Sequence, residues 1–465
     1  MSGLSPQPPT PQPTPPRRVL VANRGEIAVR VIRACHDLGW TAIAVHSDVD
    51  ADSLHVRLAD EAVEIGPAAA AQSYLRPEAI LDAARRTGAQ AIHPGYGFLS
   101  ENADFAQAVI DAGLRWVGPS PHVIAMMGDK ETARRTARDA GVPVVPGSDL
   151  LADADAALAA AEQVGYPVLV KARAGGGGKG IRAAADAGEL AKQFEEAGRE
   201  VKGAFGDDGL YLERSLQQVR HVEVQILGDS QGNVVHLFER ECSLQRRRQK
   251  VIEEAPAPTL DREVAAAMHA SAVALAAAVG YTSAGTVEFL VDPSGEYFFI
   301  EMNTRIQVEH GVTEELTGVD LVVEQLRIAF DEPIGVKQEE IAMRGAVIEL
   351  RLNAENPKFH FFGCPGAVNS VTFPAGPGVR VDTGVVSGST IQPHYDSMVA
   401  KVVVAGASRE QAIARATRAA GETLWDGPIT TLGFLRDVLG TEWFQAADFH
   451  TGTIDEKLPE LLESL

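Results

Sequence analysis

In the run Glu301-Met302-Asn303-Thr304-Arg305-Ile306-Gln307-Val308-Glu309, a polar side chain recurs at every second residue, with mostly apolar residues between. In an extended chain, this period places five functional groups on one side. They are two carboxylates, two carboxamides and a guanidinium, a set that indicates a site rather than a merely wet surface. We therefore expect an extended segment from Glu301 to Glu309 that carries a functional site.

The residues before this run predict a β-hairpin, because strand-like runs at 286–291 and 297–300 flank a turn at 292–296. The predicted register sets Glu288 opposite Glu301, with Cβ atoms roughly 5 Å apart. Two carboxylates about 4 Å apart repel by roughly 1 kcal/mol in water and about 4 kcal/mol at an effective dielectric of 20. A hard divalent cation removes this cost, and all-oxygen ligands favour Mg2+, which usually brings nucleotide phosphates. The alternative is a solvated hairpin with outward-pointing glutamates.

A second element supplies a candidate nucleotide site. Val168-Leu169-Val170-Lys171 predicts a short buried strand, which leads into Ala174-Gly175-Gly176-Gly177-Gly178-Lys179-Gly180. Backbone amides in a loop with so few side chains can approach phosphate oxygens, with lysines as counter-charges. The glycine spacing matches neither a Walker loop nor a dinucleotide-binding fingerprint, which argues against both.

Composition limits the class of protein. The 465 residues suffice for two to four domains, and a hydrophobic share of 45% supports proper cores. The formal charge of −21 makes nucleic acid an unfavourable partner. No stretch is long and apolar enough to span a bilayer. Residues 1–16 are rich in proline and fit a disordered leader better than a signal or transit peptide.

The cysteines favour a reducing compartment. Cys35, Cys242 and Cys364 are an odd number without metal or redox spacing, so we expect free thiols and a cytoplasmic location. Cys242 precedes a basic run and is expected to be a small buried filler.

From Arg18 to about Met127, strand-like and helical segments alternate, which predicts an α/β domain with a parallel sheet. A further helix is expected to begin near Asp129, whose carboxylate can cap it, and to stop at Gly141-Val142-Pro143.

Together, the hairpin, the paired glutamates and the glycine loop resemble the ATP-grasp superfamily, and finer motifs resemble biotin carboxylases within it. The resemblance runs from Arg18 to about Asp455. Its most specific motifs are the opening run and six others: Ala22–Ala28, His93–Asn102, Met127–Lys130, Gln245–Lys250, Val251–Pro256 and Tyr395–Met398.

The resemblance implies an ATP-grasp fold of the α/β (α+β) class, with a parallel-sheet N-terminal domain, a small mobile lid and a C-terminal domain. After the leader at 1–16, the expected domains are 17–127, 128–332 with the lid at about 144–211, and 333–460. The chain from Arg344 onward is expected to form a second α/β or β-rich layer.

The implied reaction is ATP-dependent carboxylation of biotin by bicarbonate through carboxyphosphate. By resemblance, Glu309 is the base, Arg305, Lys250 and the amide of Val308 hold bicarbonate, and Gln307 flanks them. Arg351 stabilises the biotin enolate. On the ATP side, the resemblance assigns binding roles to Lys130, Lys171, Gly177, Gly178, Glu213, Leu216, His221, Gln245, Arg248 and Glu288. It assigns Mg2+, or alternatively Mn2+, to Glu288, Glu301 and Asn303.

Three positions depart from the family pattern. Arg248 stands where histidine is usual, so we expect ATP to bind with altered affinity. Gly311 replaces a proline after His310 and is expected to loosen the loop that follows Glu309. Phe362-Gly363-Cys364-Pro365 lacks the common proline-serine pair.

Partners also follow from the resemblance. A Met-Lys-Met biotin-attachment turn is absent from the sequence, so a separate biotin carboxyl carrier protein, carboxyltransferase subunits and a homodimer are expected. The chain then performs the first half-reaction of an acetyl-CoA or other acyl-CoA carboxylase. The alternatives are the biotin carboxylase component of a pyruvate carboxylase, another ATP-grasp ligase, or a non-catalytic ATP-binding paralogue.

Overall fold

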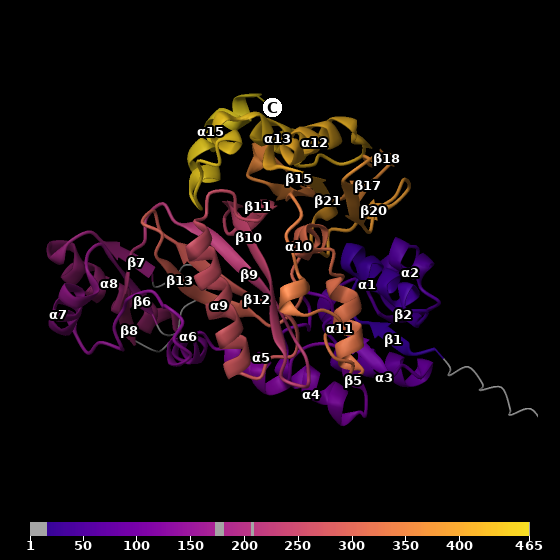
Figure 1. Ribbon diagram of the computed structural model, residues 1–465, viewed down its shortest axis with the longest axis horizontal. Helices are drawn as coiled ribbons and strands as arrows, with labels where there is room; N and C mark the ends of the chain where they lie inside the picture. Colours follow the sequence, from indigo (N-terminus) through magenta and orange to yellow (C-terminus); the bar gives the residue numbers. More distant parts are fainter. Residues whose placement is uncertain (1–15, 173–180, 206–208, 465) are drawn as a thin grey trace, which may run out of the picture.

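The alternating apolar and helical segments at the N-terminus form a five-stranded parallel sheet in the order β3-β2-β1-β4-β5, as predicted. The computed structural model describes residues 16–172, 181–205 and 209–464 (Figure 1). The strands of this sheet are β1 (Arg18–Val21), β2 (Thr41–Ser47), β3 (Glu61–Gly66), β4 (Ala91–His93) and β5 (Arg115–Trp116). The helices are α1 (Gly25–Asp37), α2 (Leu54–Leu58), α3 (Pro77–Thr87), α4 (Ala103–Asp111) and α5 (Pro121–Gly128).

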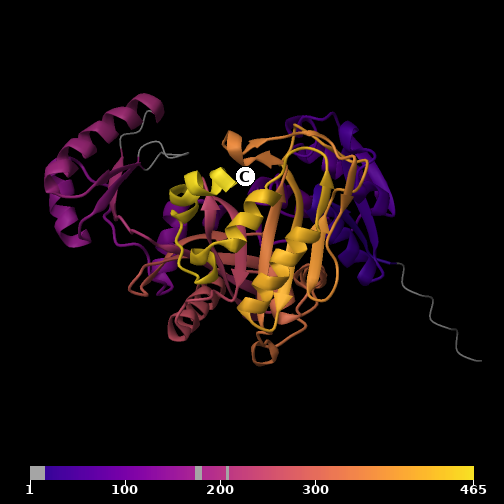
Figure 2. The same ribbon diagram turned by 90° about the horizontal axis from the view of Figure 1, so that it is seen from above.

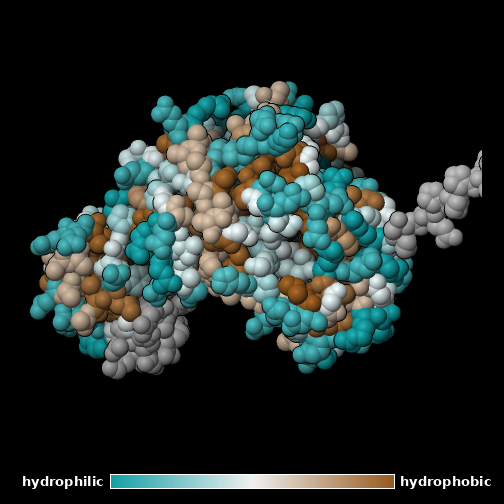
Figure 3. Space-filling view, turned by 60° about the horizontal axis from the view of Figure 1, so that its bottom comes forward, coloured by the Kyte–Doolittle hydropathy of each residue, from teal (hydrophilic) through white to brown (hydrophobic). Residues whose placement is uncertain are grey.

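A small lid follows helix α6 (Lys130–Asp139), which begins after Asp129 as predicted. The Asp129 carboxylate accepts a hydrogen bond from the Thr132 amide at 2.8 Å. The lid has its own apolar core and an antiparallel sheet in the order β7-β6-β8. It stands apart from the rest in Figure 2, and the face shown in Figure 3 is notched beside it. Its elements are α7 (Ala154–Val164), β6 (Val168–Ala172), β7 (Ile181–Ala184), α8 (Ala187–Phe205) and β8 (Leu210–Arg214).

The body is built on an eight-stranded antiparallel sheet in the order β13-β12-β9-β10-β11-β14-β21-β19. The last three of these strands come from the C-terminal part of the chain. They extend the central sheet, where the sequence had suggested a separate second layer.

The body's larger strands are β9 (Arg220–Gly228), β10 (Val234–Arg246), β11 (Gln249–Ala255), β12 (Ser283–Val291), β13 (Tyr297–Asn303), β14 (Ala346–Asn353), β19 (Val379–Thr383) and β21 (Met398–Gly406). Its helices are α9 (Arg262–Ala278), α10 (His310–Thr317), α11 (Leu321–Ala329), α12 (Arg409–Glu422), α13 (Leu432–Gly440), α14 (Glu442–Gln445) and α15 (Thr453–Ser464). Short strand pairs complete it: β15 (Glu355–Asn356) with β16 (Phe362–Gly363), β17 (Gly366–Ala367) with β20 (Thr390–Ile391), and β18 (Ser370–Thr372) with β22 (Leu424–Asp426).

The N-terminal unit contacts the C-terminal strands through the motifs that the sequence singled out. Asn23 Nδ2 donates to the carbonyl oxygens of Pro94 and Tyr96, at 2.6 and 2.8 Å. The Tyr96 hydroxyl donates to Glu26, and Lys401 on β21 lies 3.4 Å from the same carboxylate. These motifs therefore join two parts of the molecule that are distant in the sequence.

All three cysteines are free, as expected, and Cys242 is fully buried. Among the described residues, no helix combines the length and the apolar character needed to cross a membrane. The proline-rich leader, apart from Pro16, lies outside the described residues.

Candidate active site

Glu288 and Glu301 face each other on β12 and β13, as the hairpin pattern predicted. The pairing depends on a β-bulge at Ile300. Because Phe289 pairs with Phe299, an unbulged strand would set Ile300 opposite Glu288. One extra residue in β13 therefore brings the two carboxylates together.

The extended segment is shorter than predicted. Strand β13 ends at Asn303, and the chain then turns into α10, with Glu309 at the helix N-cap position. The prediction of one extended face to Glu309 was therefore wrong. The turn still gathers the polar groups, because Asn303 Nδ2 and Gln307 Nε2 each donate to Glu288 Oε1 at 2.8 Å.

The row of charges continues across the sheet. Glu223 on β9 is opposite Glu288, and Arg240 on β10 is opposite Glu223. Both Glu223 and Arg240 are completely buried, and Arg240 Nε donates to Glu223 at 2.6 Å. Arg240 Nη2 also donates to Gln307 at 2.7 Å. A buried charge costs several kcal/mol unless it is paired, so Arg240 compensates one carboxylate of the row.

Lys250 is the central cation of this cluster. Its Nζ lies within ion-pair distance of three carboxylates: Glu223 at 2.6 Å, Glu288 at 3.3 Å and Glu309 at 2.5 Å. A bulge at Val251 turns Lys250 to the face of the sheet that carries Arg351. Burial alone would raise the pKa of Glu288, but the charges of Lys250 and His221 hold it well below its usual range.

Glu309 is held between two cations. It is 2% exposed, and its Oε2 accepts from Arg351 Nη2 at 2.9 Å while Lys250 contacts Oε1. Burial opposes ionisation, but Lys250 and then Arg351 lower the pKa of Glu309 well below its usual range. The fold thus brings together three of the four residues assigned to catalysis.

The fourth, Arg305, points elsewhere. Its Nε donates to Glu101 at 3.0 Å and its Nη2 to Asn303 Oδ1 at 3.0 Å. Among the described residues, no ion pair joins Arg305 to Glu309. Val308 was assigned to bicarbonate together with Arg305. Its carbonyl oxygen accepts a hydrogen bond from Lys401 Nζ at 2.7 Å.

A second carboxyl pair lies behind Arg351. Arg351 Nη2 is 2.5 Å from Glu253 Oε1, and Glu253 on β11 is opposite Glu349 on β14. Burial raises the pKa of Glu253 to about 7, although Arg351 opposes the shift. Burial, with a further contribution from Glu253, raises the pKa of Glu349 well above its usual range.

The residues assigned to ATP are more dispersed. Lys130 is exposed at the first position of α6, and Arg248 is exposed in the turn between β10 and β11. Lys171 on β6 pairs with Glu213 on β8, which also accepts from Arg134 at 2.9 Å. Leu216 follows β8 and is half-buried. The assigned Gly177 and Gly178 lie outside the described residues.

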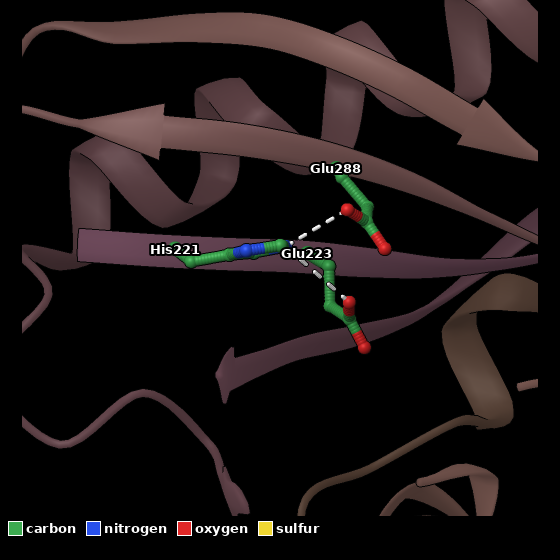
Figure 4. A group of neighbouring side chains, drawn as sticks. All are labelled: His221, Glu223 and Glu288. Atoms are coloured by element: carbon green, nitrogen blue, oxygen red, sulfur yellow. Dashed lines mark ion pairs between the residues drawn. The ribbon is translucent and has the colours of Figure 1, made fainter. Parts of the chain in front are cut away.

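His221 belongs to the charged cluster. Its ring points between Glu223 and Glu288 (Figure 4), with Nε2 3.7 Å and 3.0 Å from their carboxylates. Gln245 Nε2 contacts Nδ1 at 2.9 Å. Burial would lower the pKa of His221, but Glu288 raises it above the usual value. These three side chains could together hold a metal ion, yet a histidine that keeps its proton acts as the counter-charge itself.

The oxygen set at the hairpin suits a hard cation better. Glu301 is half-buried, and its side chain forms no hydrogen bond or ion pair within the described part of the chain. Burial and then the charge of Glu288 raise its pKa, and the charges of Lys130 and His221 offset only part of this shift. The carboxylate oxygens of Glu288 and Glu301 fit Mg2+ or Mn2+, whereas the Asn303 carboxamide turns its nitrogen to Glu288 and its oxygen to Arg305.

Of the three departures from the family pattern, Gly311 differs from what the sequence predicted. It is buried in the first turn of α10, so it does not loosen a loop as the sequence had suggested. An added Cβ would lie 3.2 Å from Val403 Cγ2 and 3.4 Å from Glu349 Oε2. The residues Phe362–Cys364 lie at the end of the β15–β16 hairpin, where Phe362 is exposed.

Sequence reasoning missed several members of the cluster: Glu223, Arg240, Glu253, Glu349 and Lys401. One signal was present, since His221, Glu223 and Gln225 repeat the period of two that marked the Glu301 run. No comparable signal marks Glu349, whose partner Glu253 is remote in the sequence.

Comparison with known proteins adds to this geometry. Family models match three consecutive segments: "Biotin carboxylase, N-terminal domain" at 15–124, "Carbamoyl-phosphate synthase L chain, ATP binding domain" at 129–337, and "Biotin carboxylase C-terminal domain" at 349–456. Biotin carboxylase 1 of Bacillus subtilis is 49% identical over 437 residues, covering 94% of this chain and 97% of the relative. One of the subunits of pyruvate carboxylase from Methanothermobacter thermautotrophicus is 48% identical, covering 94% of this chain and 89% of that relative.

A solved structure is also similar over nearly the whole chain. It is the biotin carboxylase domain dimer of Hydrogenobacter thermophilus 2-oxoglutarate carboxylase, in complex with MgADP, ADP and bicarbonate. It has a TM-score of 0.86 at 44% identity, and the match covers 96% of this chain and 98% of that one.

Proposed function

This chain belongs to the biotin carboxylase family, and from that premise we propose that it uses ATP and bicarbonate to carboxylate biotin on a separate carrier protein. The observation that carries the proposal is Glu309, buried between Lys250 and Arg351. This arrangement joins a carboxylate base to two cations that can hold an anion.

The low pKa of Glu309 keeps its carboxylate ionised before bicarbonate binds. A bicarbonate ion bound at Lys250 and Arg351 takes a share of their positive charge. The pKa of Glu309 then rises toward the value that a base needs, because less cationic charge stabilises its ionised form. Bicarbonate that has lost its proton to Glu309 attacks the γ-phosphate of ATP, which yields carboxyphosphate and ADP.

We propose that Arg351 acts again in the second step. When carboxyphosphate breaks down to carbon dioxide and phosphate, the released phosphate takes the ureido proton of biotin. Arg351 stabilises the enolate that results, and the biotin nitrogen captures carbon dioxide. The buried Glu253 contact at 2.5 Å supports this role, because it fixes the orientation of Arg351. Arg305, which contacts Asn303, is proposed to hold bicarbonate with Lys250.

For the nucleotide, we propose the contacts assigned above. Lys130, Lys171, Gly177 and Gly178 contact phosphates, Glu213 and Leu216 border the adenine, and His221, Gln245 and Arg248 lie near the ribose side. Glu288, Glu301 and Asn303 would hold Mg2+ or Mn2+, which neutralises phosphate charge when bound. The domain limits 17–127, 128–332 and 333–460 are likewise part of the proposal.

The final acceptor is left open by the relatives. Their names include a biotin carboxylase, a component of pyruvate carboxylase and a 2-oxoglutarate carboxylase. We propose an acyl-CoA carboxylase with separate carrier and carboxyltransferase subunits, a homodimer and a cytoplasmic location. A role in a pyruvate carboxylase remains the second candidate, favoured by the 48% identity to the relative from that enzyme.

The test is ADP release with Mg-ATP, measured with bicarbonate and free biotin separately and together. We expect turnover that requires bicarbonate, rises with biotin, and falls about 10²- to 10⁴-fold in Glu309→Gln. Glu460→Gln makes the same charge change on an exposed face and should be neutral. ATP binding without any stimulation would favour a non-catalytic module, and stimulation by another substrate would favour a different ATP-grasp ligase.

A further inference from the structure

Two loops lie side by side at one end of the candidate site. The β10–β11 turn, Arg247-Arg248, comes just before Lys250 on β11. The β15–β16 hairpin, residues 355–363, comes just after Arg351 on β14. Strands β11 and β14 are antiparallel neighbours, with Ile252 opposite Leu350. The start of β11 therefore lies beside the end of β14, so both loops are at the same end of these two strands. At about 3.3 Å per residue, Arg248 lies only about 7 Å along the chain from Lys250.

The two loops touch through the buried Arg246 and the half-buried Phe361. The Arg246 guanidinium stacks on the Phe361 ring at 4.3 Å from its centroid, and Phe361 packs edge-on against Phe434. In the same hairpin, Phe359 and Phe362 are 65% and 70% exposed.

The same two loops also carry cations that have no ion pair within the described residues. These are Arg247, Arg248 and Lys358, which are exposed. We call Arg247, Arg248, Lys358, Phe359 and Phe362 the rim patch. Two acids act on the adjacent Arg246: Asp455, and Glu355, which is buried and accepts from Ser397 at 2.5 Å. On a chain with a formal charge of −21, a basic and aromatic surface is exceptional.

Both loops also break local conformational preferences. Arg247 and Arg248 have φ values of 49° and 68°, and they form a two-residue hairpin turn for which Asn-Gly is favoured. His360 and Phe361 have φ values of 54° and 59°. Left-handed backbone costs a non-glycine residue on the order of 1 kcal/mol. Phe361 is used for packing against Phe434, but arginine at both positions of the β10–β11 turn does not serve the turn itself, which indicates that these side chains have another use.

We propose that the rim patch is the docking surface for the biotin carrier, and that the carrier presents acidic residues beside its biotinylated lysine. This inference rests on the function proposed above. A biotin tethered to a protein can reach Arg351 only if the carrier stops at the rim of the site, and the rim patch lies at that edge. Arginine and aromatic side chains are the residue types that dominate protein interfaces, and the charge favours an acidic partner.

The experiment compares acceptors of defined charge. The probes are free biotin and three biotinyl-lysine peptides of equal length, with acidic, neutral or basic flanks. In the wild-type protein, we expect kcat/KM to decrease in the order acidic, neutral, basic, with the difference shrinking as salt rises. The double variant Arg247→Glu with Lys358→Glu should lower kcat/KM for the acidic peptide about three- to tenfold and leave free biotin unchanged.

Two further variants separate the possible explanations. Arg85→Glu with Arg86→Glu makes the same charge change on α3, where both side chains are exposed, and should not alter the peptide preference. Phe362→Ser should weaken all three peptides without affecting free biotin. Equal kcat/KM for the acidic and basic peptides would overturn the proposal, as would a change of oligomeric state in the rim variants. A protein that is inactive even with free biotin would instead contradict the proposed carboxylase activity.

Discussion

The two halves of the candidate site are built differently. On the side of Glu309, carboxylates and cations are buried, and Arg240, Lys250 and Arg351 each contact at least one acid within 2.6 Å. On the nucleotide side, Lys130 and Arg248 are exposed, and Glu301 has a raised pKa. The first half is preorganised by the sheet, because its side chains come from adjacent strands with fixed register. The second half draws residues from the lid and the body, and Lys130, Arg248 and Glu301 form no ion pair within the described residues.

The largest expected difference between the halves is in stability. Lys250→Met leaves Glu223, Glu288 and Glu309 without their shared cation, and removing one member of a buried ion pair typically costs about 3–5 kcal/mol. Lys171→Met removes a partly exposed lysine of the lid from Glu213, so the cost should be below about 1 kcal/mol. Urea unfolding of both variants measures the contrast. Equal losses would show that the body cluster is not specially preorganised.

The sequence predicted one part of this cluster and not the rest, for physical reasons. The hairpin was predictable because a turn and a period of two are local patterns, but its predicted register had no bulge, and the extra residue at Ile300 is what sets Glu301 opposite Glu288. The bulges at Ile300 and Val251 were not predictable, although they decide which way Glu301 and Lys250 point. They arise from packing across the sheet.

Long-range pairing set a second limit on prediction. Glu349 and Glu253 meet because β14 pairs with β11, and nothing near either residue predicts that register. Likewise, the strands from Arg344 onward join the central sheet, because their apolar faces complete its core with α12 and α13. The overall architecture followed from the resemblance, whereas the buried carboxyl pair required the structure.

A second prediction concerns the protons of this pair. The folded-state pKa of Glu349 is raised, so the folded protein binds a proton that the unfolded chain loses above a pH of about 4.5. This contribution to stability is complete below the unfolded-state pKa and is lost as pH rises toward the folded-state pKa. Glu253 acts in the same direction, with a window that ends at about pH 7.

Glu349→Gln keeps the shape of the neutral acid and removes its titration. The decline of stability with rising pH should therefore become shallower by up to about 1.4 kcal/mol per pH unit. The comparison is urea unfolding of wild type and variant between pH 5 and pH 8. Glu339→Gln, on the surface, is the control. Parallel curves for wild type and Glu349→Gln would mean that Glu349 is ionised in the folded protein.

A smaller effect is expected at Gly311, which lies next to the preorganised half. Proline is tolerated in the first turn of a helix, where the N–H has no intrahelical partner. Gly311→Pro should stabilise the protein by about 0.4–1 kcal/mol, because it restricts the unfolded chain. Gly311→Ala introduces the same 3.2 Å contact with Val403 without locking φ, so it is the matched control. Thermal unfolding distinguishes them, and a lower Tm for both would show that Val403 cannot give way.

The smallest effect is expected on the nucleotide side, at Arg248. Its guanidinium is exposed, and a single solvent-exposed charge pair contributes about 0.2–1 kcal/mol. Arg248→His removes the permanent charge and keeps a donor, so the KM for ATP should change by about two- to fivefold while kcat with free biotin stays within a factor of about two. Arg247→His, in the same turn, is the matched control and should leave the KM for ATP unchanged. An unchanged KM in Arg248→His would remove this residue from the nucleotide site and leave it only in the rim patch. A tenfold or larger effect would mean that ATP buries the guanidinium, so that this half of the site becomes as tightly paired as the other once its ligand is bound.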